Sequence, residues 1–331
     1  KLRKKKKQCM NIGSIKLKNK VIVGPMAGVS DRSFRSLLAR YEPGLVYSEM
    51  ISDKGILYKN QNTLDMCVKD PHEGLVAMQL FGREIKDMIV AARYLNDFSE
   101  CDIIDINMGC PVSKVVKTNG GASLMKEEDH AAELVYAIKK VITKPLTVKI
   151  RKGWDHQSVN AVSMAKKLEA AGADALAIHG RTRSDMYSHH VDLEIIRKVK
   201  AALTIPVIGN GDITSVAKAT EMFETTGVDA IMIARGVWGQ PWFVKEIIEG
   251  LKGRAYIPHE HERFSVFLEH IDAICEDKGE YIGVREMRTH AAMMLKGLPN
   301  SAQVKNALVN AQSKLEMIDI MHSYLMKGTS L

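Results

Sequence analysis

Hydrophobic residues gather in short runs that recur through the first three quarters of this chain. Eight such runs, rich in valine and isoleucine, alternate with stretches whose apolar positions repeat at helical spacing. Strands that are buried on both faces give continuous apolar runs, and their alternation with helices is typical of a parallel sheet. The eight runs span residues 21–23, 45–47, 75–78, 103–106, 146–150, 175–178, 206–208 and 230–233.

The stretches between these runs predict helices at residues 32–40, 85–95, 127–142, 159–171, 193–201 and 213–225. Eight strand–helix units fit a (β/α)8 TIM barrel, which takes about 250 residues. A doubly wound sheet is the alternative, but no G-x-G-x-x-G follows the first run, which weakens a dinucleotide-binding fold. We therefore expect an α/β chain whose barrel covers residues 11–248.

The last quarter of the chain has a different pattern. Residues 249–258 resemble a linker, and apolar positions from 264 to 325 keep helical spacing without strand-like alternation. We therefore expect a small all-α helical-bundle domain over residues 249–331. Basic residues outnumber acidic ones between positions 285 and 314, where aromatic residues are absent. This composition predicts contacts with phosphates rather than stacking on bases.

Polar residues follow seven of the eight apolar runs, at the carboxyl ends of the predicted strands. In a TIM barrel these ends surround the active site, so we expect these residues to meet at the barrel mouth. The residues that we expect in the site, from these seven strand ends and the turns after them, are Pro25, Met26, Ala27, Gln79, Asn107, Cys110, Lys149, Arg151, His179, Asn210, Gly211, Asp212, Ala234, Arg235 and Gly236.

Cys110 lies in the turn that follows the fourth run. Gly109 permits unusual backbone angles and Pro111 lacks an amide donor, so the strand must end here. Three interpretations are open: an inert thiol, a nucleophile and a proton donor. A nucleophile needs a neighbouring base or cation, and His179 is one only if the fold brings it near. A thiol with a pKa near 8.5 can also act as a general acid.

Lys149 and Arg151 are two residues apart, so their side chains share one face of a strand. An ammonium group buried without a partner is costly, so Lys149 needs an acceptor or an anion. The pyrimidine edge of a flavin suits it, because that edge gains negative charge on reduction. An internal ion pair with Asp105 or Glu49 is the alternative.

Glycines at the ends of the last two runs predict a phosphate site, which is where TIM barrels commonly place one. Gly211 and Gly236 let backbone amides approach a phosphate, and Arg235 adds a fork of donors. Two tight turns with no ligand are the alternative. We expect Asp212 to cap the helix that follows it.

Net charge and cysteine content restrict the class of protein further. The formal net charge is +8, but six of these charges lie within residues 1–7, so two remain for the rest of the chain. The tail at residues 1–10 is either an RNA-binding arm or a solvated start. Five cysteines without a C-x-x-C pair argue against disulfides and against a zinc or iron–sulfur site, so we expect no metal.

Run lengths and loop lengths also indicate where the protein resides and which segment could move. No apolar run approaches the roughly 20 residues that span a bilayer, so we expect no membrane insertion. The cysteine content fits a reducing cytoplasm, and we expect a monomer. The segment 112–128 is long for a connection between a strand and a helix. It is either a mobile lid, with Lys114 and Lys117 facing a polyanion, or a surface loop.

The residues from Asn107 to Val115, NMGCPVSKV, resemble the signature of the tRNA-dihydrouridine synthases. The similarity continues at Pro25-Met26-Ala27-Gly28, Gln79, Lys149-Ile150-Arg151, Ile178-His179-Gly180-Arg181, Gly209-Asn210-Gly211-Asp212 and Ile233-Ala234-Arg235-Gly236. Gln240-Pro241-Trp242 and residues 287–295 look most like the bacterial DusB-type subgroup.

The resemblance implies an FMN-containing TIM barrel that uses NADPH to reduce the C5=C6 bond of D-loop uridine in tRNA. By that resemblance Pro25, Met26 and Ala27 would line the flavin ring, and Gln79 and Lys149 would hold its pyrimidine edge. The phosphate would lie against Asn210, Gly211, Asp212, Ala234 and Arg235. The residues beside the flavin and the target base would be Asn107, Arg151 and His179.

A mechanism follows from this resemblance. The uridine would be flipped into the barrel mouth, hydride would pass from flavin N5 to C6, and Cys110 would protonate C5. The residues expected to contact RNA are Lys114, Lys117, Arg285, Arg288, Lys296 and Lys305. Two alternatives remain: an FMN barrel acting on a free pyrimidine, as in dihydroorotate dehydrogenases, and a flavin-free tRNA-binding protein.

Overall fold

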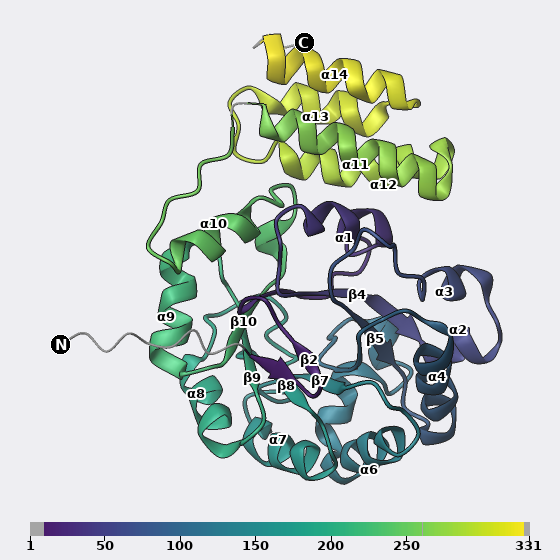
Figure 1. The fold of residues 1–331 in the computed structure, drawn as a ribbon, viewed down its shortest axis with the longest axis vertical. Coiled ribbons are helices and arrows are strands. Elements are labelled where there is room, and N and C mark those ends of the chain that lie inside the picture. Colours follow the sequence, from purple (N-terminus) through teal and green to yellow (C-terminus); the bar gives the residue numbers. More distant parts are fainter. Residues whose placement is uncertain (1–9, 260, 328–331) are drawn as a thin grey trace.

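Eight parallel strands close into a barrel at the centre of the protein (Figure 1). The computed structural model describes residues 10–259 and 261–327, and the basic residues 1–7 therefore lie outside the described part. Each of the eight predicted apolar runs forms one strand. The strands are β3 (Val21–Val23), β4 (Leu45–Ser52), β5 (Val76–Phe81), β6 (Ile103–Met108), β7 (Leu146–Arg151), β8 (Ala175–His179), β9 (Val207–Asn210) and β10 (Ala230–Ile233).

Closure of the sheet decides between the two folds that the sequence left open. Strand β10 pairs with β3 in parallel, so the sheet has no free edge and cannot be doubly wound. Helices surround the barrel (Figure 1), and the predicted (β/α)8 fold is confirmed. The surrounding helices are α1 (Arg32–Ala39), α4 (Ile85–Phe98), α6 (Glu128–Lys139), α7 (Ala161–Ala170), α8 (Leu193–Ala202), α9 (Val216–Thr226) and α10 (Phe243–Gly250).

The apolar side chains of the strands divide into two cores. One core lies between the strands and the surrounding helices, and the other fills the barrel interior with Ile22, Leu45 and Tyr47 among its members. A hairpin of β1 (Asn11–Ile12) and β2 (Ile15–Lys16), which the sequence did not predict, adds Ile12 to the interior core. The hairpin lies near the amino ends of the strands, so that end is covered and the opposite end can hold a site.

Four helices follow the barrel: α11 (Glu262–Lys278), α12 (Glu280–Met294), α13 (Ser301–Asn310) and α14 (Lys314–Lys327). Apolar residues such as Phe267, Met287, Leu308 and Met321 are fully buried between them. The prediction that an all-α domain follows the barrel is therefore confirmed. Its predicted start at residue 249 falls within the last residues of α10, and that boundary remains a prediction.

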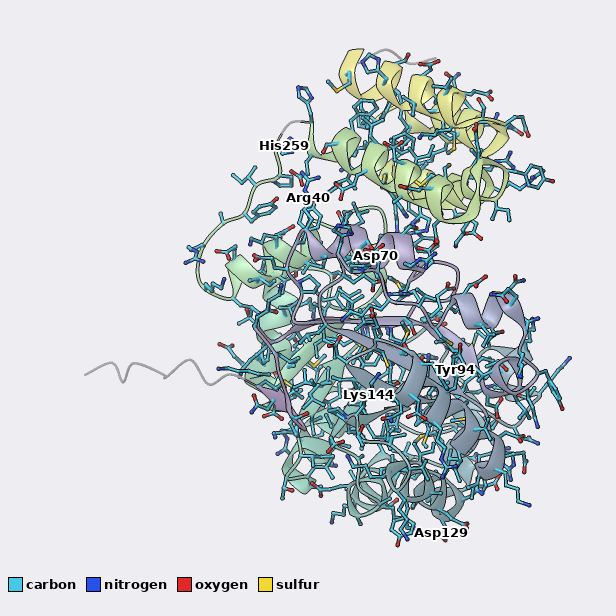
Figure 2. All side chains as sticks on the ribbon, turned by 45° about the vertical axis from the view of Figure 1, so that its right-hand side comes forward. Arg40, Asp70, Tyr94, Asp129, Lys144 and His259 are labelled. Carbon is cyan, nitrogen blue, oxygen red and sulfur yellow. The ribbon has the colours of Figure 1, made fainter. Side chains whose placement is uncertain are left out.

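Polar contacts join the helical domain to helix α1 of the barrel. Arg40 lies at this junction (Figure 2), where its Nη1 donates to Glu269 at 3.0 Å. Lys278 Nζ donates to Asp31 at 2.7 Å, and the Tyr41 hydroxyl donates to Glu262. These contacts hold the helical domain beside the barrel mouth, where the end of α12 reaches the cavity described below.

One local expectation is wrong, and the segment after Cys110 is partly helical. Helix α9 begins at Val216 rather than at residue 213, and Ser215 is its cap, accepting from the Lys218 amide. The prediction that Asp212 caps this helix is therefore wrong. The segment after Cys110 forms helix α5 (Ser113–Val116) and the short 3-10 helix η1 (Gly121–Lys126). Most of η1 is buried, so its packing resembles core rather than a free surface loop.

Candidate active site

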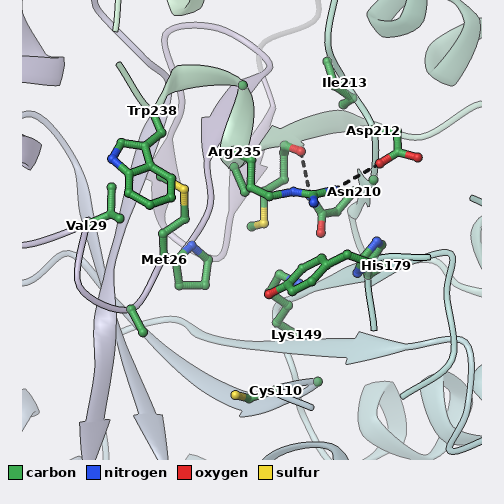
Figure 3. A pocket seen from close by; sticks show the side chains of 18 of the residues that line it. Met26, Val29, Cys110, Lys149, His179, Asn210, Asp212, Ile213, Arg235 and Trp238 are labelled. Carbon is green, nitrogen blue, oxygen red and sulfur yellow. Dashed lines mark hydrogen bonds and ion pairs between the residues drawn. The ribbon is translucent and has the colours of Figure 1, made fainter. Parts of the chain in front are cut away.

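A cavity of about 700 Å3 opens at the carboxyl ends of the strands (Figure 3). All fifteen residues predicted for catalysis or cofactor binding lie in its lining, although they come from seven different strand ends. The helical domain adds Met293 and Lys296, so the cavity lies between the barrel and that domain. The sequence therefore predicted which residues line this cavity, and their roles in catalysis or cofactor binding stay predictions.

Hydrogen bonds to the Asn107 side chain shape the turn that carries Cys110. Its Oδ1 accepts from the backbone amides of Gly109 at 3.1 Å and Cys110 at 2.8 Å. Its Nδ2 donates to Gln79 Oε1 at 2.6 Å. Arg151 Nε donates to the Gly109 carbonyl at 2.8 Å. Two cavity residues from neighbouring strands therefore hold this turn rigidly.

The Cys110 thiol lies at the edge of the cavity and is 9% exposed. Burial raises its pKa above the ordinary value, and the Val112 amide, Arg151 and Lys149 oppose that shift only in part. At neutral pH the sulfur therefore carries its proton. This state suits a proton donor and disfavours a thiolate nucleophile.

Lys149 points into the same cavity from β7 (Figure 3). Burial, followed by the charge of Arg151, lowers its pKa to about 8. Among the described residues it makes no hydrogen bond or ion pair. Neither Asp105 nor Glu49 lies within salt-bridge distance of Lys149, although the charge of Asp105 opposes the lowering of the Lys149 pKa. Asp105 accepts from Thr147 and Gln79 instead. An anionic ligand group would supply the missing partner.

His179 ends β8, which is separated from the strand before Cys110 by β7 alone, and both side chains line the cavity (Figure 3). It is 7% exposed, and burial together with the charges of Lys149 and Arg151 lowers its pKa well below the ordinary value. Its ring is therefore neutral at physiological pH. A neutral imidazole can donate or accept one hydrogen bond to a ligand without adding charge.

The ends of β9 and β10 contribute Asn210, Gly211, Asp212 and Arg235 to the cavity. Gly211 has φ of +132° and Asp212 φ of +47°, backbone angles that expose amides in a tight turn. The guanidinium of Arg181 pairs with Asp212, at 2.9 Å from Nη1 to Oδ1. Arg235 lies 3.4 Å from the same carboxylate and remains half exposed, so its donors are available to a phosphate.

Tyr187 is a cavity residue that the sequence analysis missed. It lies in the long connection between β8 and α8, with its ring 4.6 Å from the Arg235 guanidinium carbon. Arg151 Nη1 donates to the carbonyls of Thr182 and Met186, and so fixes the backbone beside Tyr187. An aromatic residue in a connection longer than usual for a barrel was a signal that could have identified it.

The six residues predicted to contact RNA have different surroundings. Lys296 lines the cavity, and Lys114 and Lys117 are exposed on and after α5. Arg285 stacks on Tyr281, with 3.5 Å between the guanidinium carbon and the ring centre. Lys305 is half-buried on α13, away from the cavity lining.

Arg288 has a structural contact within the helical domain. Its Nη2 donates to the Ala311 carbonyl at 2.6 Å and its Nε at 3.2 Å, so it ties α12 to the end of α13. A substitution of Arg288 would therefore disturb this packing as well as any RNA contact, which makes it a poor test of binding.

The sequence also missed a cationic cluster on the rim of the barrel. Lys126 Nζ and the Arg183 guanidinium carbon each lie 4.6 Å from the centre of the Trp154 ring. Neither cation has an acidic partner among the described residues. This cluster adds positive charge on the η1 side of the mouth.

The described residues contain neither a membrane-spanning helix nor a metal-binding cluster. None of their helices has the length and apolar character needed to cross a bilayer. Within residues 10–259 and 261–327, no three histidine, cysteine, aspartate or glutamate side chains gather in a metal-binding arrangement.

Comparison with known proteins identifies relatives over most of the chain. The family model for dihydrouridine synthase matches residues 21–326. A probable tRNA-dihydrouridine synthase of Rickettsia bellii is 39% identical over 302 residues, which cover 90% of this chain and 92% of the relative. tRNA-dihydrouridine synthase B of Vibrio vulnificus is 39% identical over 315 residues, covering 94% and 98% respectively.

Among solved structures, histamine dehydrogenase from Rhizobium sp. 4-9 shares the fold. It superposes with a TM-score of 0.54 at 16% identity, over 82% of this chain and 50% of that protein. At this identity the likeness supports the barrel architecture alone.

Proposed function

Because this chain belongs to the dihydrouridine synthase family and resembles its B type, we propose that it reduces uridine in tRNA to 5,6-dihydrouridine with FMN as cofactor. The single observation that carries this proposal is the arrangement of the mouth. A protonated thiol, an unpartnered ammonium group and a phosphate-like cradle face one cavity, within a barrel whose family reduces uridine. NADPH as the reductant, a cytoplasmic location and a monomeric state remain predictions.

The cavity suits FMN in size and in chemistry. Its volume of about 700 Å3 lies within the range of pockets for drug-sized ligands and cofactors. Lys149 would pair with the pyrimidine edge of the flavin, since its ammonium group has no other partner among the described residues. Gly211, Asp212 and Arg235 would hold the phosphate with backbone amides and a guanidinium group. Pro25 and Met26 would cover the ring system.

Cys110 would complete the reduction. A bound FMN, reduced by NADPH, would supply the hydride for C6 of the uracil ring. The Cys110 Sγ–H then donates its proton to C5, which saturates the C5=C6 bond and leaves a thiolate that regains a proton from solvent. Since burial keeps the thiol protonated, this donor is ready before the substrate arrives.

The neighbours of Cys110 would place the two transfers on adjacent carbons. Asn107 and Arg151 hold the turn from two strands, so the sulfur has a fixed position. Arg151 and the neutral His179 line the cavity nearby and can hydrogen-bond the carbonyl groups of the base. Such positioning on rigid strand ends lowers the entropic cost of the reaction.

The substrate must enter as a base flipped out of the tRNA. Cations around the mouth would hold the phosphates on both sides of the flipped nucleotide. Lys296 belongs to the helical domain, whereas Lys114, Lys117, Lys126 and Arg183 belong to the barrel. This distribution favours a folded RNA over a free pyrimidine, which needs no such surface.

The decisive experiment compares possible oxidants of the reduced flavin. The purified protein should be yellow, which would exclude a flavin-free tRNA-binding protein. Under anaerobic conditions, unmodified tRNA should reoxidise the reduced flavin far faster than free uridine or orotate does. Equal rates with a free pyrimidine would contradict the proposal and would favour the enzyme class that acts on free bases.

A further inference from the structure

Asp105 is a carboxylate buried inside the barrel, two residues before Asn107 on β6. It has no exposed surface and does not line the cavity. Its Oδ1 accepts from Thr147 Oγ1 at 2.5 Å, and its Oδ2 accepts from Gln79 Nε2 at 2.7 Å. It has no cationic partner in a salt bridge among the described residues. Its charge acts on Lys149 in the cavity, and its hydrogen-bonded route to the cavity runs through Gln79.

A chain of hydrogen bonds leads from Asp105 to the catalytic turn. Gln79 donates with its Nε2 to Asp105, so its Oε1 is left to accept from Asn107 Nδ2 at 2.6 Å. Asn107 Oδ1 then accepts from the amides of Gly109 and Cys110. An ionised carboxylate only accepts hydrogen bonds, so the Gln79 side chain must turn its NH2 group towards Asp105. Its oxygen then faces Asn107, which must turn its own NH2 group towards Gln79 and its oxygen towards the turn.

The position of Asp105 is costly for the fold. Burial raises its pKa to about 6, and the bonds from Thr147 and Gln79, with the charge of Lys149, offset that shift only in part. An apolar side chain would avoid this cost in the core of a barrel. Residues that lower stability in this way are commonly retained for function.

We propose that Asp105 is a positioning residue: its carboxylate orders Gln79 and Asn107 and thereby fixes the Cys110 turn. The hydrogen bonds within the protein itself carry this proposal. It rests on the proposed function only for the identity of the ligand that Gln79 and Asn107 face, which would be the flavin.

Two substitutions of Asp105 distinguish the effect of its hydrogen bonds from the effect of its negative charge. Asp105→Leu removes both acceptors, so the Gln79 amide loses its fixed orientation. Asp105→Asn removes the charge, but its amide oxygen can accept from Gln79 while its NH2 donates to Thr147 Oγ1. Thr147→Val is the matched control, because it deletes a bond to Asp105 that is not part of the chain leading to Cys110.

Hydrogen exchange at the amides of Gly109 and Cys110, measured without ligand, reports directly on the turn. We expect Asp105→Leu to accelerate exchange there about tenfold, through more frequent local opening. The same variant should weaken FMN binding by about tenfold, the equivalent of one or two hydrogen bonds. Asp105→Asn and Thr147→Val should keep both quantities within about threefold of the unchanged protein.

Several results would overturn the proposed role of Asp105. The proposal would be overturned if Asp105→Leu left the exchange rates and the FMN affinity unchanged. It would also be overturned if Asp105→Asn or Thr147→Val changed both quantities as much as Asp105→Leu does. If Asp105→Leu does not fold, Gln79→Leu cuts the same chain one link nearer to Cys110, and unchanged exchange in that variant would overturn it equally. If the unchanged protein binds no FMN, the proposed function fails while the exchange measurement still decides this inference.

Discussion

At the scale of single residues, the site combines groups whose protonation is set by burial. Burial raises the pKa of Cys110 and lowers those of Lys149 and His179. The shifts at Cys110 and His179 favour the protonated thiol and the neutral ring that the proposed chemistry uses. The shift at Lys149 disfavours the ammonium form, which therefore needs an anionic ligand group beside it. These states follow from packing around the barrel mouth, and two substitutions test them.

Cys110→Ala should retain FMN and lose most dihydrouridine formation, since it removes the proton donor without altering the cradle. We expect the rate at which tRNA reoxidises the reduced flavin to fall by 10²–10⁴-fold, about the range of general acid catalysis. Cys275→Ala, in the helical domain, is the matched control and should keep its rate. Near-normal turnover in Cys110→Ala would refute the proton-donor role.

Lys149→Met should stabilise the ligand-free protein, and the gain should depend on pH. The folded-state pKa of Lys149 is about 8 against an ordinary 10.5, so the unfolded chain binds more protons between these values. The cost of the buried ammonium is therefore complete below pH 8 and fades as the pH rises towards 10.5.

Thermal or urea unfolding of both proteins at pH 7 and pH 10 measures this difference. We expect a gain of up to about 3 kcal/mol at pH 7, which should shrink at pH 10. Lys198→Met on the exposed face of α8 is the control and should show no such trend. A gain that does not change with pH would show that Lys149 is not the titrating group.

At the scale of elements, the sequence predicted all eight strands because each is a buried apolar run. It also predicted the residues at the strand ends, since a barrel requires them to converge. Tyr187 was missed because its place depends on how Arg151 holds the connection after β8. The β1–β2 hairpin was missed because two-residue strands carry no periodicity.

Helix α12 should contribute to tRNA binding through its exposed Arg285 and through Lys296 just beyond the helix. The double variant Arg285→Glu, Lys296→Glu should weaken tRNA binding. It should also reduce the slope of log affinity against log salt by about one for each phosphate that the variant no longer neutralises. Binding measured across a salt series, for example by fluorescence anisotropy, gives both values.

Two controls make this test specific. Lys198→Glu on α8 should leave the salt slope unchanged, and FMN content should be equal in all variants. An unchanged slope in the double variant would mean that the helical domain does not dock RNA through this face.

At the scale of the whole molecule, the cavity exists because two parts of the chain meet. Helix α1 carries the polar contacts to α11, and the end of α12 closes one side of the mouth. Composition predicted that a helical domain follows the barrel, but no pattern in the sequence gives the contact between them. That contact depends on close approaches such as the one at Gly239.

Gly239→Ala should disturb the placement of α12 without affecting the barrel. Gly239 has φ of +81°, and a Cβ there would lie 2.5 Å from the Met293 carbonyl oxygen. The clash is with the backbone of Met293 rather than with a flexible side chain, so α12 must shift to relieve it. We expect tRNA affinity to fall by about tenfold while FMN affinity stays within about threefold.

Gly253→Ala is the matched control, because Gly253 has φ of +74° and nothing within 4 Å of an added Cβ. Both variants share the cost of the left-handed backbone, about 1–2 kcal/mol. Equal tRNA affinity in the two variants would show that the interface at Gly239 does not position the helical domain for binding.

The measurement that tests the central claim most directly is a map of dihydrouridine in tRNA treated with the purified protein, FMN and NADPH. We predict that dihydrouridine forms at one or more D-loop uridines and that Cys110→Ala does not form it. Absence of dihydrouridine at every position, with FMN bound and reduced, would contradict the account.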